Sequence, residues 1–163
     1  MKISWKHITV EAAILACALL IQQTLIRWIS LGPVRPDLTL IALMLLALRR
    51  GPVAGLYAGM LLGLVQDVYA FETLGASVLS NCLVGYTLGF FEEKVIKSLP
   101  AIRILLLGGA VLLHDVVFYL TAGFRGEIFW NALLRLTLPS GIYTLFSGGL
   151  IFYTFLRLKS REA

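Results

Sequence analysis

Residues 37–67 read DLTLIALMLLALRRGPVAGLYAGMLLGLVQD. An apolar run follows the aspartate, and two arginines, a glycine and a proline interrupt it before a second apolar run begins. Aspartate favours the N-cap of a helix, and Gly-Pro favours the end of one helix and the start of the next. The stretch therefore predicts two apolar helices, at residues 38–48 and 52–68, joined by a tight basic turn.

Further apolar runs flank this helical hairpin on both sides. A helix needs about 20 apolar residues to span a hydrocarbon core, or fewer where the bilayer thins. Six runs are candidates, at residues 8–29, 38–48, 52–68, 77–91, 102–122 and 139–156. The chain is 59% hydrophobic and its mean hydropathy is +0.88, far above that of soluble proteins. These features predict an all-α integral membrane protein, a six-helix bundle that forms a single domain over residues 1–163.

The segment between the last two runs, residues 127–138, has a different pattern. Apolar side chains and Trp130 alternate there with Glu127, Asn131 and Arg135. Tryptophan is enriched at the membrane interface, so one interpretation is an amphipathic helix that lies along the membrane surface. The alternative is an extended loop.

The basic residues divide unevenly between the two sides of the predicted bundle. Of the 14 lysines and arginines, ten fall on the side of both termini and four on the other. Cytoplasmic loops carry the excess of positive charge, which places the N- and C-termini in the cytoplasm. Because these charges flank apolar runs, the net charge of +5 does not indicate a nucleic-acid partner.

Small residues recur at intervals of four along two neighbouring predicted helices. The first series is Gly51, Gly55, Gly59 and Gly63, and it leads to Asp67. The second series is Ser77, Asn81, Gly85 and Gly89. Such stripes allow the backbones of two helices to approach closely. We therefore expect both to face helices rather than lipid, either within the chain or in a partner.

Ionisable side chains inside apolar helices are costly unless they are paired or hydrated. Asp67 lies near the end of its helix, where it can cap the following turn or contact a partner. His114 and Asp115 lie in the middle of the fifth run, and adjacent helical residues point about 100° apart, so we expect no pair between them. Together with Asn81 and Tyr119, they form a possible buried polar site.

The sequence contains no recognisable catalytic set. It has no Ser/His/Asp constellation, no phosphate-binding glycine loop, no metal-binding histidine pair and no dense carboxylate cluster. We therefore expect neither an enzyme nor a protein with a metal or other cofactor.

The order of these features resembles the MreD family of rod-shape-determining proteins. The resemblance rests on the runs Arg35-Pro36-Asp37-Leu38, Leu48-Arg49-Arg50-Gly51-Pro52, Gly63-Leu64-Val65-Gln66-Asp67, Leu74-Gly75 and Asn81 to Gly85-Tyr86. The chain departs from the family pattern at Glu72-Thr73, where many relatives carry a proline or a small residue.

The resemblance implies a non-enzymatic scaffold in the inner membrane of a bacterium. Such a protein binds MreC and acts through it with RodA and a class B penicillin-binding protein, while MreB filaments lie on the cytoplasmic side. It supports peptidoglycan synthesis and rod cell shape. The family also resembles in fold the six-helix substrate-binding components of vitamin uptake transporters.

Two functional hypotheses follow from this resemblance. In the first, the small-residue groove and the outer turns bind the partner through Arg35, Asp37, Gly55, Gly59, Gly63, Asp67 and Glu72. In the second, the chain is a small-molecule-binding subunit of a transporter, with a pocket lined by Asn81, His114, Asp115 and Tyr119.

Overall fold

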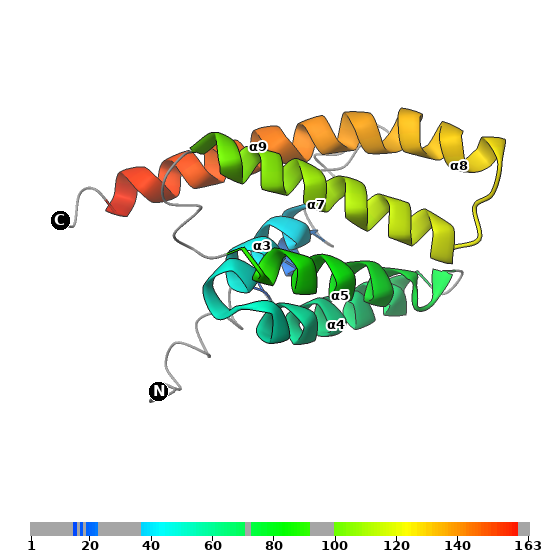
Figure 1. Ribbon diagram of the computed structural model, residues 1–163, viewed down its shortest axis with the longest axis horizontal. Helices are drawn as coiled ribbons and strands as arrows, with labels where there is room; N and C mark the ends of the chain where they lie inside the picture. Colours follow the sequence, from blue (N-terminus) through cyan, green and yellow to red (C-terminus); the bar gives the residue numbers. More distant parts are fainter. Residues whose placement is uncertain are drawn as a thin grey trace.

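The computed structural model describes residues 15, 17, 19–22, 37–70, 73–91 and 100–159. Within this part of the chain every regular element is helical (Figure 1). The elements are α3 (Leu38–Arg50), α4 (Pro52–Tyr69), α5 (Ala76–Gly89), α7 (Pro100–Thr121), α8 (Glu127–Ala132), the π-helix η2 (Leu133–Thr137) and α9 (Leu138–Lys159). The all-helical fold is therefore confirmed, whereas most of the first predicted span, residues 8–29, lies outside the described residues.

The helices form two layers with α3 between them (Figure 1). Helices α4 and α5 lie side by side in one layer, and α7 and α9 lie side by side in the other. Helix α5 also contacts α7, which joins the two layers, and α3 contacts all four of these helices. The predicted hairpin is present, since Gly51 separates α3 from α4 with a φ of +88°.

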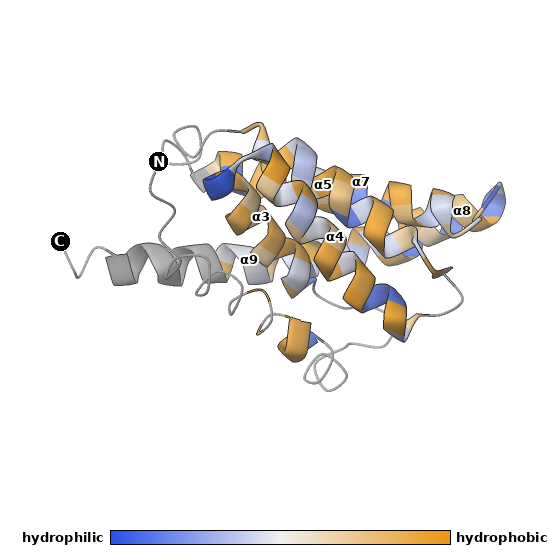
Figure 2. Cartoon of the chain, turned by 90° about the horizontal axis from the view of Figure 1, so that it is seen from below, coloured by the Kyte–Doolittle hydropathy of each residue, from blue (hydrophilic) through white to orange (hydrophobic). Residues whose placement is uncertain are grey.

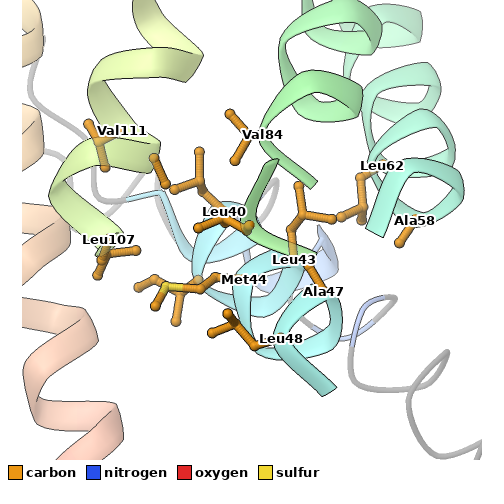
Figure 3. Packing of buried hydrophobic residues seen from close by; sticks show 13 residues of the cluster. Leu40, Leu43, Met44, Ala47, Leu48, Ala58, Leu62, Val84, Leu107 and Val111 are labelled. Carbon is orange, nitrogen blue, oxygen red and sulfur yellow. The ribbon is translucent and has the colours of Figure 1, made fainter. Parts of the chain in front are cut away.

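Helix α3 forms the centre of the hydrophobic core. Asp37 begins it, because its side chain accepts a hydrogen bond from the Leu40 amide at 3.0 Å, as expected of an N-cap. Leu43 and Met44 are fully buried, and Figure 3 shows α3 side chains packed between Val84 of α5 and Leu107 of α7. A helix that is apolar on all sides is stable only when neighbours surround it. This explains why so short an apolar run folds as a helix.

Helices α4 and α5 pack backbone against backbone along the two small-residue stripes. A Cβ atom added to Gly55 would collide with the carbonyl group of Gly85, and one added to Gly59 with that of Asn81. At Gly63 the added atom would lie 2.6 Å from the Ser77 carbonyl oxygen. The stripes therefore face each other in an antiparallel pair, and their function in this structure is internal packing. A partner could contact these glycines only if α5 moved away from α4.

The outward faces of the helices are apolar (Figure 2). On α7, Leu105 is 75% exposed and Leu112 is 49% exposed. The segment Ala101–Thr121 is long and apolar enough to cross a membrane, and no other described helix passes the same test of length and composition. The outward leucines suit contact with lipid rather than with water. The six-span topology and the cytoplasmic position of the termini stay predictions.

Residues 127–138 form a helix, so the extended-loop alternative is wrong. The segment runs on from α8 through η2 into α9 without a break in the helix (Figure 1). Its position along the membrane surface stays a prediction. Pro139 has no N–H to donate to the carbonyl of Arg135, four residues earlier, and that residue lies in the π-helical turn η2. The Ser140 hydroxyl donates to the Leu136 carbonyl at 2.6 Å. This hydrogen bond gives a partner to a backbone carbonyl oxygen close to the proline. The helix can therefore continue through it.

The glycine contacts predict the effect of a single methyl group. Gly59→Ala should destabilise the protein by about 2 kcal/mol, because the new Cβ must push α5 away. Gly109→Ala on α7 is the matched control, since no atom lies within 4 Å of the position of its Cβ. We expect it to be neutral or slightly stabilising. Thermal unfolding in detergent measures both variants, and equal melting temperatures would contradict the packing described here.

Candidate functional site

Asp67 caps the N-terminus of α5 across the turn between α4 and α5. Asp67 is buried, with an exposed fraction of 3%. It accepts hydrogen bonds from the amides of Gly75 at 2.8 Å, Ser77 at 3.1 Å and Val78 at 3.2 Å. Residue 75 is the N-cap of α5 and, as a glycine with a φ of +90°, offers no side chain of its own. Of the two roles predicted for Asp67, the structure shows capping.

A second polar contact joins α3, α4 and α5 below this cap. The Asn81 side-chain amide donates to the Gln66 carbonyl oxygen at 2.8 Å, and the Gln66 amide donates to the Thr39 hydroxyl at 3.2 Å. Asn81 and Thr39 are buried. Buried polar groups that satisfy one another fix a single relative position of the helices that carry them. Neither Gln66 nor Thr39 was predicted as a site residue, although each is a polar residue in an otherwise apolar run.

An open apolar groove runs along the outer face of the α4–α5 pair, beside the Asp67 cap. Its volume is about 430 Å³. The residues that line it are Leu64, Asp67, Val68, Leu74, Gly75, Val78, Leu79 and Cys82. The floor of the groove is formed by α4 and α5. The glycine contacts and the Asp67 cap fix the relative position of these two helices, so this floor is rigid.

The residues predicted to bind a partner occupy different places. Gly55, Gly59 and Gly63 are covered by α5, as described above. Asp37 is the N-cap of α3, and its backbone amide donates to the Thr144 hydroxyl of α9 at 3.0 Å. Asp67 is buried beneath the turn, whereas Arg35 and Glu72 lie outside the described residues.

His114 and Asp115 form a pair, contrary to the prediction. Their Nδ1 and Oδ1 atoms lie 2.9 Å apart. The rotation of 100° between adjacent helical residues fixes the directions of their Cα–Cβ bonds. The imidazole of His114 is nevertheless long enough to bend back toward the carboxylate of Asp115. The prediction was wrong because it treated a backbone angle as a side-chain direction.

The structure also divides the predicted buried polar site. Asn81 bonds to Gln66 between α4 and α5, away from His114 and Asp115 on α7, whereas Tyr119 lies about one turn after Asp115 on α7 and packs against the rings of Phe118 and Phe124. The four residues therefore do not line one pocket, and the transporter hypothesis loses the convergent site that it requires. Among the residues that the structure describes, no group of three or more His, Cys, Asp or Glu side chains is placed to hold a metal ion.

Comparison with known proteins gives one match. The family model described as rod shape-determining protein MreD matches residues 6–158 of the 163-residue chain. No curated protein and no solved structure matches. The match covers all the helices described above except the last residue of α9.

The Asp67 cap predicts a local effect on α5. Asp67→Ala leaves the amides of Ser77 and Val78 without their acceptor, at a cost of about 1–3 kcal/mol for each buried group. We expect a loss of stability of that order and at least about tenfold faster hydrogen exchange at these amides. Glu127→Gln, at an exposed acid on α8, is the control and should change neither. Unchanged exchange at residues 77 and 78 in Asp67→Ala would show that the carboxylate does not cap this helix.

Proposed function

Because the chain belongs to the MreD family of rod-shape-determining membrane proteins, we propose that it is a non-enzymatic scaffold of the bacterial elongation complex. The family itself implies a part in rod shape determination and a place in the membrane. The scaffold resides in the inner membrane, with both termini in the cytoplasm. The division of basic residues between the two sides of the chain supports this orientation.

The direct partner in this proposal is MreC. Through MreC the scaffold acts on RodA and its class B penicillin-binding protein, and so on peptidoglycan synthesis, while MreB lies on the cytoplasmic side. These partners come from the family resemblance. The chain contributes a helical bundle whose described part holds no recognisable catalytic set, which suits a protein that positions others.

The observation that supports a docking surface is the outer face of the α4–α5 pair. Leu61, Leu64 and Val68 of α4 are 61%, 48% and 58% exposed, and the apolar groove beside them has a rigid floor. In a membrane, helices associate through close packing rather than through burial from water. A preformed groove loses little conformational entropy when it receives a helix. We propose that the membrane helix of MreC packs there.

The polar residues at the turns would set the orientation of the partner. Arg35 and Glu72 lie beyond the ends of α3 and α4 in the sequence, on the side that the charge distribution places outside the cytoplasm. Charged groups at the rim of an interface govern its register more than its affinity. We assign Arg35 and Glu72 this role and keep Asp37 and Asp67 as the caps that hold the adjoining helices.

Shortening the groove side chains tests the docking surface. The double variant Leu64→Ala and Val68→Ala should reduce co-purification of MreC from solubilised membranes by about tenfold, since interface truncations commonly cost more than 1 kcal/mol. It should also leave depleted cells rounded when it replaces the native protein.

The matched control removes the same kind of exposed apolar surface from the other layer. Leu105→Ala and Leu112→Ala on α7 should bind MreC as the native protein does. Thermal unfolding verifies that both double variants are folded. A folded groove variant with undiminished co-purification would exclude this surface, and loss of binding in both variants would mean that the site is not confined to α4 and α5.

A further inference from the structure

A small polar cavity lies in the other half of the molecule, between the start of α3, α7 and α9. Its volume is about 160 Å³. The residues that line it are Gln22, Asp37, Leu40, Val111, His114, Asp115, Ser140 and Thr144. Liquid water takes about 30 Å³ per molecule, so this volume suits a few water molecules. The cavity is separate from the groove on α4 and α5.

The cavity is rich in hydrogen-bond acceptors because its hydroxyl groups have already donated. The Thr144 hydroxyl donates to the Ser140 carbonyl at 2.8 Å, and the Ser140 hydroxyl donates to Leu136. These two oxygens therefore present lone pairs. Two carboxylates, Asp37 and Asp115, add acceptors and negative charge. Two further polar residues line the cavity, Gln22, which carries no charge, and His114.

His114 has one ring nitrogen bonded and one without a protein partner. Asp115 as a carboxylate is an acceptor, so the proton between them belongs to Nδ1 of His114, at 2.9 Å from Oδ1. The other nitrogen, Nε2, is buried and has no hydrogen-bond partner among the described residues. In the neutral ring this nitrogen is a lone-pair acceptor, and a buried acceptor without a donor is costly.

We propose that this cavity is a proton-binding site, in which the His114 imidazole, bonded at Nδ1 to Asp115, takes a second proton at Nε2. The Nε2 lone pair forms the new N–H bond, and the proton arrives from solvent as hydronium, which leaves as water. Because Nε2 is buried, side chains at the wall of the cavity move aside for this step. The imidazolium then shares the cavity with two carboxylates, Asp115 of α7 and Asp37 at the start of α3. Negative charges around the same cavity favour the charged form of the ring.

The position of Asp37 gives proton binding a structural consequence. Asp37 caps α3 through Leu40 and contacts Thr144 of α9 through its own amide. A positive ring on α7 attracts this carboxylate, so protonation tightens the junction of α3, α7 and α9. Loss of the proton leaves the two carboxylates with no positive charge among the described residues that line the cavity.

Nitrogen NMR tests the assignment directly, because the chain has two histidines. The variant His7→Gln, labelled with ¹⁵N-histidine and placed in lipid nanodiscs, leaves His114 as the sole signal. We expect the Nδ1–H tautomer at high pH and reversible conversion to imidazolium within about pH 5–8. A ring that keeps one protonation state from about pH 5 to pH 9 would overturn the proposal.

Charge variants separate a proton site from a merely structural histidine. Asp37→Asn and Asp115→Asn each remove a negative charge that favours imidazolium, and each should displace the titration curve from that of the parent protein. Glu127→Gln removes an exposed charge and should leave the curve in place. A curve unmoved by Asp37→Asn would exclude this residue from the site. The titration of His7→Gln does not depend on whether either aspartate variant folds.

Discussion

The close backbone contact between α4 and α5 is the constraint on which the rest of the structure depends. Gly55 and Gly59 bring α4 so near to α5 that a methyl group has no room. This distance places the Asp67 carboxylate over the free amides of α5 and places Asn81 beside Gln66. Three separate features, the glycine stripe, the cap and the amide contact, therefore specify the same relative position of the two helices.

Much of this pair could be predicted from the sequence because local rules apply to it. Apolar runs interrupted by Arg49-Arg50-Gly51-Pro52 mark the helix ends, and spacing by four marks the faces in contact. Asp67, near the end of its helix, was predicted either to cap the following turn or to contact a partner, and the structure shows the cap. Which surface binds a partner could not be predicted, because the glycines of a stripe look alike whether the chain or a partner covers them.

The sequence-based predictions failed where the structure depends on how far a side chain reaches, or on how a helix accommodates a proline. The pair of His114 and Asp115 depends on the bend of one imidazole, which no spacing rule contains. The rod of α8, η2 and α9 depends on a π turn and a serine hydroxyl that together accommodate Pro139. Asn81 was grouped with the histidine by chemical type, although it bonds to Gln66 between α4 and α5.

The lengths of the helices have a consequence for the surrounding membrane. Helix α3 has 13 residues and α5 has 14, which at 1.5 Å per residue gives about 20 Å. A typical hydrocarbon core is about 30 Å thick, so helices of this length are mismatched to it. In the six-span topology that the sequence predicts, lipids beside the outward face of α5 would have to compress, and the free-energy cost would grow with the length of α5–lipid contact. A neighbouring protein that replaced those lipids would relieve the deformation, so in that topology bilayer elasticity itself would favour protein contacts on this side of the bundle.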